Sequence, residues 1–263
     1  MPLRYKYKEG EKWLEVAKLT AVTTSDDETY GNMLKSDLTK EITYLNETKS
    51  VEKDGSALID VTIKKVKFSV TQSGMTFDYD SETDTGKSTN PIIQAMAQFK
   101  GLKFQVKVSD MGKVLETKGG GGENIVEPDL AEVLRVVFPK EPVKKGDKWT
   151  NEGAHVKINS TLESLDGNTA IIKSEVTSIV KSDGESSEPN DRKLTGGSCT
   201  FHFDAKEGKP VKTVSHVSYE LTVGPPMLPK EIKMNMKSGI EQEFKPAGAM
   251  DEKKEDKKEK EDF

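Results

Sequence analysis

One short phrase occurs twice in this chain and constrains its fold more than any other feature. Gly-Glu-Lys-Trp at residues 10–13 returns as Gly-Asp-Lys-Trp at residues 146–149, and the chain has no other tryptophan. Two further signals follow each copy in the same order: an Asp-Gly turn before an apolar run, at residues 54–55 and 166–167, and a Gly-Lys hairpin tip, at residues 112–113 and 208–209. A shared order of this kind predicts an internal duplication.

The two copies are not spaced equally. Trp13 and Asp54 are 41 positions apart (54 minus 13), whereas Trp149 and Asp166 are 17 apart (166 minus 149). The first unit is therefore expected to carry extra residues at about 25–49.

Composition favours sheets that bury one face. Only 33% of the residues are hydrophobic, and the predicted strands alternate apolar with polar residues, as in antiparallel sheets with one solvated face. We therefore expect a mainly β protein with minor α: two related antiparallel curved sheet units, with two short helices between them.

Most of the strands are readable from period-two alternation. We expect the first unit to open with strands at 3–8 and 12–24 and to continue with a hairpin over 39–70, turning at residues 53–55. In its second strand the apolar parity changes between Ile63 and Val66, which predicts a β-bulge near Lys64–Lys65. A strand with alternating Phe104, Val106 and Val108 follows and turns back at Gly112. Further strands are predicted at 155–164, 169–181, 193–204, 211–223 and 231–244.

Helical spacing predicts one helix from Pro91 to Phe99, stopped by Gly101, and a second over 128–137. The domain boundaries follow: a first β unit at 1–118 with a helix near 91–100, a Gly-rich joint at 119–127, a helix and second β unit at 128–245, and a disordered charged tail at 246–263. The tail has no apolar period, and like charges recur in it at four-residue spacing.

Charge and cysteine content bound the function. A net charge of −5, with 45 acids and 40 bases well mixed, argues against a nucleic-acid partner. A single cysteine excludes an intrachain disulfide.

No apolar stretch is long enough to cross a bilayer, and the N-terminus lacks the apolar core of a signal peptide. We expect a periplasmic or secreted protein whose export signal is absent from this chain, or a cytoplasmic one if the N-terminus is native.

Each group of residues that could carry chemistry also has a structural explanation. Cys199 and His202 have metal-ligand spacing, but on a strand they point to opposite faces, and His216 would pair with His202 only across a suitable hairpin. The acids at 78, 80, 82 and 84 alternate like calcium ligands but lack the glycine and glutamate of an EF-hand. Residues 86–89 resemble the end of a phosphate loop without its first glycine. No catalytic constellation is visible, and no cofactor or metal is expected.

Several phrases together resemble a known family. They are Tyr-Lys-Tyr-Lys-Glu-Gly-Glu-Lys-Trp at 5–13, Gly-Leu-Lys-Phe-Gln-Val at 101–106, Asp-Met-Gly-Lys-Val-Leu at 110–115 and Phe-Pro-Lys-Glu-Pro-Val-Lys-Lys-Gly-Asp-Lys-Trp at 138–149. Over residues 3–245 the chain resembles an uncharacterised family of bacterial extracytoplasmic β-rich proteins, often exported or lipid-anchored. It is also similar, at the level of fold, to lipoprotein-carrier half-barrels, in which a curved sheet wraps short helices around an apolar cavity.

The resemblance implies a non-enzymatic extracytoplasmic binding or structural protein of the bacterial envelope. The alternative is a carrier or binder of a lipid or another apolar ligand in a cavity between sheet and helices. The residues predicted to line that cavity are Trp13, Ile92, Met96, Phe99, Phe104, Leu134 and Trp149. For the two tryptophans, packing in the core under a curved sheet is the competing interpretation.

Overall fold

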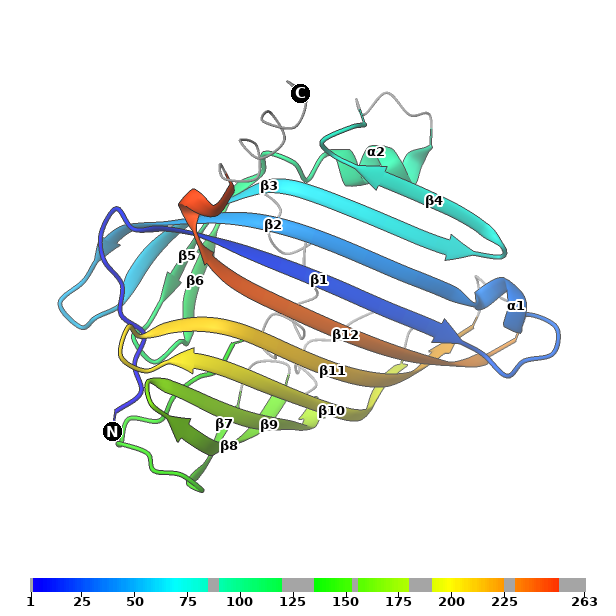
Figure 1. Ribbon diagram of the computed structural model, residues 1–263. Coiled ribbons are helices and arrows are strands. Elements are labelled where there is room, and N and C mark those ends of the chain that lie inside the picture. Colours follow the sequence, from blue (N-terminus) through cyan, green and yellow to red (C-terminus); the bar gives the residue numbers. More distant parts are fainter. Residues whose placement is uncertain are drawn as a thin grey trace, which may run out of the picture.

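The computed structural model describes residues 2–84, 90–119, 135–152, 156–179, 191–224 and 230–250. Within these ranges twelve strands form one antiparallel, curved sheet, shown in Figure 1. The strands are β1 Lys12–Thr24, β2 Ser36–Val51, β3 Ala57–Gln72, β4 Met75–Asp80, β5 Lys103–Val108, β6 Val114–Lys118, β7 Lys148–Glu152, β8 Val156–Asp166, β9 Thr169–Ile179, β10 Asp191–Asp204, β11 Lys209–Val223 and β12 Ile232–Pro246. The helical segments are α1 Gly31–Leu34, α2 Pro91–Ala97 and the short 3-10 helix η2 Ala247–Met250.

The two predicted units are joined into a single sheet. Its order is β6-β5-β3-β2-β1-β12-β11-β10-β9-β8-β7, with β4 paired to β3 beside this path. β1 pairs with β12 without a break from Trp13 opposite Pro246 to Thr24 opposite Asn235. Two separate sheets would each expose an unpaired edge here, and the β1–β12 ladder removes both edges.

The hairpin and the bulge predicted from the sequence are confirmed. β2 and β3 turn through Gly55, which has a φ of +82°. Thr43 lies opposite Lys65 and Tyr44 opposite Ile63, so Lys64 is the extra residue. The bulge keeps Ile63 and Val66, which are 1% and 0% exposed, in the same core.

Several element predictions need correction. Residues 3–8 are not a strand of the sheet, and β4 was not predicted, although Met75, Phe77 and Tyr79 alternate with polar residues. The first helix ends at Ala97, before its predicted end. Of the second predicted helix only 135–137 are described, and they are not helical. The rest of that helix, the Gly-rich joint beyond residue 119 and the tail beyond residue 250 lie outside the described residues.

The core consists of two main apolar clusters on the inward-facing parity of the strands. One lies in the half formed by β1–β6 and centres on Tyr44, Ile59 and Val106. The other lies in the half formed by β7–β12 and centres on Ile172, Phe203 and Tyr219. Each fully buried apolar side chain of this size stabilises the fold by about 1.5–3 kcal/mol.

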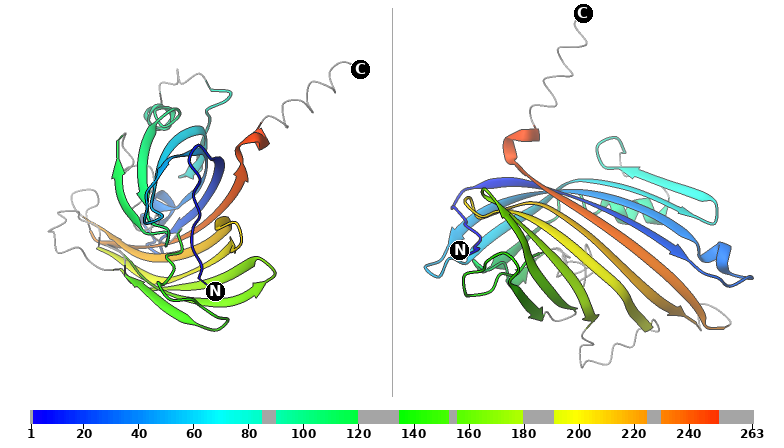
Figure 2. Two further views of the ribbon diagram at one scale, coloured as in Figure 1. Left: turned by 90° about the vertical axis from the view of Figure 1, so that its left-hand side faces the viewer. Right: turned by 60° about the horizontal axis from the view of Figure 1, so that its bottom comes forward.

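Residues 3–8 form a segment that we call the strap, which crosses one end of the curved sheet (Figure 2). The backbone N–H of Tyr5 donates to the carbonyl of Asp110, at the β5–β6 tip, over 2.7 Å. The next N–H, of Lys6, donates to the carbonyl of Gly208, at the β10–β11 tip, over 3.0 Å. Two successive amides thus tie together hairpins from the two halves.

Side chains reinforce the strap. Leu3 is 2% exposed and belongs to the cluster of the β7–β12 half. The Arg4 guanidinium donates to the carbonyl of Pro139 over 2.8 Å and pairs with the carboxylate of Asp110 over 3.3 Å. The strap therefore also holds the segment that leads into β7.

Glycine is required where the strap passes the two tips. Gly112 and Gly208 have φ angles of +93° and +68°. A Cβ on Gly112 would lie 2.5 Å from the Tyr5 ring, and one on Gly208 would lie 2.7 Å from the Lys6 backbone nitrogen. Neither position has room for a side chain.

The repeated phrase is a repeated turn. Gly10 donates its N–H to the carbonyl of Thr48 over 2.8 Å, and the N–H of Thr48 donates to Glu11 over 3.0 Å. The second copy makes the same pair of bonds: Gly146 to Leu162 over 2.8 Å, and Leu162 to Asp147 over 3.1 Å. The two turns lead into β1 and β7, respectively; a common origin of the two halves stays a prediction.

Replacing Gly208 by alanine tests the strap. We expect Gly208→Ala to lower the free energy of unfolding by about 2–4 kcal/mol, because left-handed strain adds to the clash with Lys6 and Arg4. Gly167→Ala is the matched control: its φ is +58°, but nothing lies within 4 Å of the added Cβ, so strain alone should cost about 1 kcal/mol. Urea unfolding measures both, and equal losses would contradict the tight passage of the strap.

Candidate functional site

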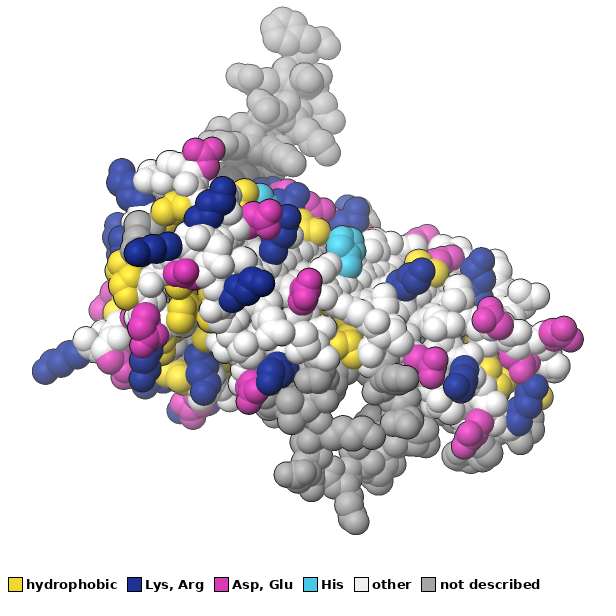
Figure 3. Space-filling model, turned by 90° about the horizontal axis from the view of Figure 1, so that it is seen from below, with side chains coloured by type: hydrophobic (Ala, Val, Ile, Leu, Met, Phe, Trp, Pro, Cys, Tyr) yellow, Lys and Arg dark blue, Asp and Glu magenta, His cyan; other side chains and the backbone are white. Residues whose placement is uncertain are grey.

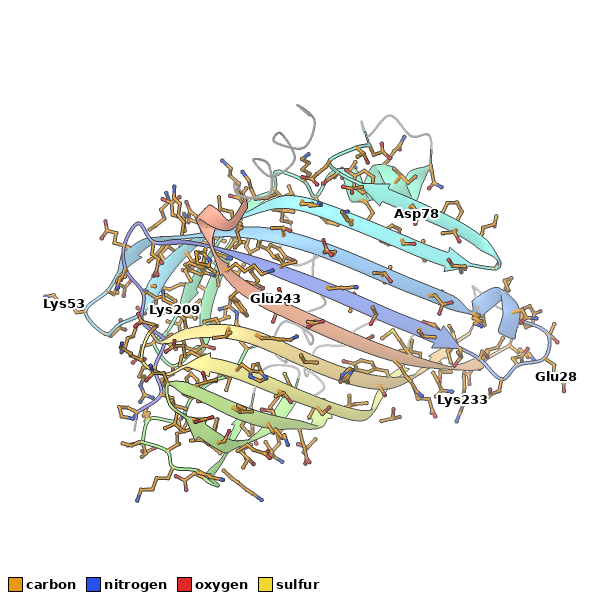
Figure 4. All side chains as sticks on the ribbon, in the orientation of Figure 1. Glu28, Lys53, Asp78, Lys209, Lys233 and Glu243 are labelled. Carbon is orange, nitrogen blue, oxygen red and sulfur yellow. The ribbon has the colours of Figure 1, made fainter. Side chains whose placement is uncertain are left out.

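A cavity of about 350 Å³ lies against the strap. Its walls come from the strap, the start of β1, the adjoining ends of β10, β11 and β12, and residues 135–136. Lys209, labelled in Figure 4, marks this end of the sheet, and Figure 3 shows hydrophobic side chains at the surface at the same end. The aromatic residues that line the cavity are Tyr5, Tyr7, Trp13, Phe201, Phe203 and Phe244.

The aromatic wall is held by ring contacts. Tyr5 stacks on Tyr7, with centroids 6.1 Å apart and rings 5° from parallel. Tyr5 also meets Phe203 edge to face at 5.1 Å, and Phe203 meets Phe138 at 4.8 Å. Such geometries add about 0.5–1.5 kcal/mol per pair beyond area burial. These contacts join the strap to the aromatic wall of the cavity.

A lysine lies over the aromatic rings at the rim. The ammonium of Lys209 is 5.5 Å from the Trp13 ring centroid and 5.9 Å from that of Tyr7. It also forms an ion pair with Glu11, which comes from the first repeated turn. The rim therefore already holds one cation against the π faces.

Polar residues from β1 and β12 interrupt the apolar wall. Glu15 shares a strand face with Trp13, and Gln242 shares one with Phe244; all four line the cavity. The side-chain amide of Gln242 donates to Glu15 Oε1 over 2.7 Å. Gln242 is 6% exposed, and its Oε1 has no hydrogen-bond donor within the described part of the chain.

Burial governs ionisation around the cavity. It raises the pKa of Glu15, while the charge of Arg135 and the amides of Gln242 and Asn46 act in the opposite direction. Burial likewise raises the pKa of Tyr7 to about 12, against an opposing effect of Arg135. The pKa of Tyr5 also rises by burial. Both phenols are therefore neutral hydrogen-bonding groups at physiological pH.

The structure places the predicted cavity residues in different surroundings. Trp13 lines the cavity and also packs against the cluster of the β1–β6 half. Met96, Phe99 and Phe104 pack against the same cluster but do not line the cavity. Trp149 packs against the other cluster, and its indole N–H donates to Val137 over 2.8 Å. Ile92 is in α2 with its side chain outside the described set, and Leu134 lies outside the described residues.

Sequence reasoning missed most of this cavity. Tyr5 and Tyr7 alternate with basic residues and were assigned to a strand. A usable signal was Glu15. It is the one charged residue among the inward-facing residues of β1, and it lies between Trp13 and Ala17 on that face. Gln242 interrupts β12 in the same manner, between Ile240 and Phe244.

The metal-site candidates do not assemble. His202 lies opposite Lys212, and His216 lies opposite Ser198 on the same strand pair. Of the acids near β4, Asp80 pairs with Lys67 over 3.0 Å. Within the described ranges no cluster of three His, Cys, Asp or Glu side chains is placed to hold a metal ion.

No described helix combines the length and apolar character needed to span a bilayer.

The thiol of Cys199 should be unreactive in the native state. Cys199 is 3% exposed beside Phe201 and Phe203, and burial raises its pKa to about 12. We expect iodoacetamide to leave the native protein unlabelled near pH 8 and to label it rapidly in denaturing urea, as followed by mass spectrometry. Rapid labelling without denaturant would contradict this placement.

Glu15 should make stability depend on pH. A raised folded-state pKa means that the unfolded chain releases this proton first as the pH rises, so the ionised carboxyl reduces stability above its ordinary range. Glu15→Gln removes this effect. The free energy of unfolding of Glu15→Gln minus that of wild type should therefore increase as the pH rises from about 4 to about 7, as measured by urea titrations. A difference that is constant or decreases would refute the burial effect.

Comparison with known proteins adds a partial family match. A model of a family of unknown function (DUF6263) matches residues 54–127. The matched span includes β3, β4, α2, β5 and β6, and only Ile59 among the cavity-lining residues lies in it. No curated protein matches the chain.

Proposed function

We propose that this chain is a non-enzymatic binding protein that holds a small amphipathic molecule in the cavity at the strap end of the sheet. The observation that carries the proposal is the aromatic-walled volume of about 350 Å³. Small-molecule sites typically measure about 300–1,000 Å³ and combine an apolar wall with a few placed polar groups. Both properties are present here.

The walls of the cavity suit a ligand that has an apolar body and one polar end. Tyr5, Tyr7 and Trp13 supply flat apolar surface, while Glu15 and Gln242 supply hydrogen-bonding atoms. Because the tyrosines are fixed by ring stacking, little side-chain entropy is lost when a ligand enters. Pre-organisation of this kind favours binding of an intact molecule.

The resemblance to exported proteins adds a location to the proposal: outside the cytoplasm, in the bacterial envelope. Fractionation of the native host, with detection by an antibody to this chain, tests that part separately. Recovery from the periplasm, the envelope or the medium supports it, and recovery with the cytoplasmic contents overturns it.

A steric block at the cavity tests binding. Val211 lines the cavity and is 45% exposed, so Val211→Phe should fold normally and narrow the cavity. We expect wild type to enhance the fluorescence of N-phenylnaphthylamine saturably and Val211→Phe to weaken that binding about tenfold or more.

Val114→Phe is the matched control, because Val114 is a 44%-exposed strand valine on β6 that does not line the cavity. It should bind the dye as wild type does. In a Trp149→Phe background, Trp13 should transfer excitation to the bound dye. Equal binding by both valine variants, or no binding by wild type, would overturn the proposal.

A further inference from the structure

Two polar side chains of the cavity wall, Glu15 and Gln242, form one hydrogen bond with each other and keep unused acceptor positions. Glu15 and Gln242 come from paired strands: Glu15 lies opposite Phe244, and Gln242 lies opposite Ala17, so the two side chains are diagonal neighbours on one face. The bond between them uses a donor of Gln242 and one oxygen of Glu15. A carboxyl group has two oxygens, and in the ionised form, which a neighbouring ammonium favours, it has about four acceptor positions and no donor.

Gln242 leaves an acceptor unpaired. Its side chain is buried and lines the cavity, and its Oε1 receives no hydrogen bond within the described residues. Burying an acceptor without a donor is costly unless another molecule supplies one. Glu15 therefore offers an acceptor at the cavity wall. The Gln242 Oε1 atom, which is itself buried, lies beside it as a second acceptor that a ligand reaches when the amide turns toward the cavity.

The aromatic walls also accept positive charge. Lys209 already occupies the faces of Trp13 and Tyr7 at the rim, which demonstrates that a cation is accommodated there. The competing features are the cations that line the cavity, which would attract an anion: Arg135, Lys12, Lys209 and Lys245. Of these, Arg135 acts on Glu15, and Lys209 is paired with Glu11. An anionic head group near Glu15, however, would face a carboxylate and an amide oxygen.

We infer that the cavity selects molecules whose head group donates hydrogen bonds, an amine or an alcohol, over molecules whose head group is a carboxylate. The donor binds at Glu15 and Gln242, and the apolar body lies along the aromatic wall. This inference rests on the proposed function, because it specifies the chemistry of the ligand at the same cavity.

The head-group preference is tested with three probes that share a phenylalkyl chain and differ in their polar group: phenylbutylamine, phenylbutanol and phenylbutyrate. Each is titrated into the protein by calorimetry. We expect the amine to bind most tightly, the alcohol next and the carboxylate at least about tenfold more weakly than the amine. Glu15→Gln should weaken the amine about tenfold and alter the alcohol little, because it removes the charge but keeps an acceptor.

Glu241→Gln is the matched control. Glu241 is on β12 one position from Gln242, it pairs with Lys212, and it does not line the cavity. It should leave all three affinities unchanged, and urea unfolding verifies that both variants are folded.

The possible outcomes distinguish the head-group preference from the binding function. Preferential binding of the carboxylate, or an affinity for the amine that Glu15→Gln leaves unchanged, overturns the head-group inference and leaves the binding function standing. Failure of all three probes and of the naphthylamine dye to bind the wild-type protein overturns the proposed function itself.

Discussion

Two consecutive backbone hydrogen bonds hold this end of the molecule together. The amides of Tyr5 and Lys6 reach hairpin tips at Asp110 and Gly208, more than a hundred residues away in each case and in different halves of the sheet. The β1–β12 ladder makes the halves one sheet, but a twisted sheet is free to change its curvature. The strap fixes the separation of two tips and so fixes the curvature at this end, which sets the shape of the cavity.

The cavity is also where the chain departs from the rules that govern its other strands. The inward parity is apolar along most of β1 and β12, yet Glu15 and Gln242 lie there next to aromatic rings. A carboxyl whose pKa is raised by burial reduces stability at neutral pH, and substitution by an apolar residue would remove that cost. Local violations of this kind are expected at functional sites. The same residues therefore support both the location of the proposed site and its preference for donors.

Much of the fold was predictable because its signals are local. The Asp54-Gly55 turn, the parity change at Lys64 and the alternation through Phe201 and Phe203 each depend on neighbouring residues. The strap was not predictable, since Tyr5 and Tyr7 alternate as a strand would, and nothing nearby in the sequence specifies partners beyond residue 100.

The cavity was harder to predict than the fold. Among the described candidates only Trp13 lines this cavity, and its place there depends on the strap and on the β1–β12 pairing, which are long-range features. Met96 and Phe99 pack against the cluster of the β1–β6 half without lining the cavity, and the indole N–H of Trp149 is bound to the carbonyl of Val137. Equivalent turns thus lead two tryptophans into different environments.

The most direct test of the account is a crystal structure of the protein with bound phenylbutylamine. We expect the phenyl ring against Tyr7 and Trp13, the amine within hydrogen-bonding distance of Glu15 and the Gln242 carbonyl oxygen, and the strap in its present position. Ligand density elsewhere on the sheet, or an amine directed away from Glu15 into solvent, would contradict it.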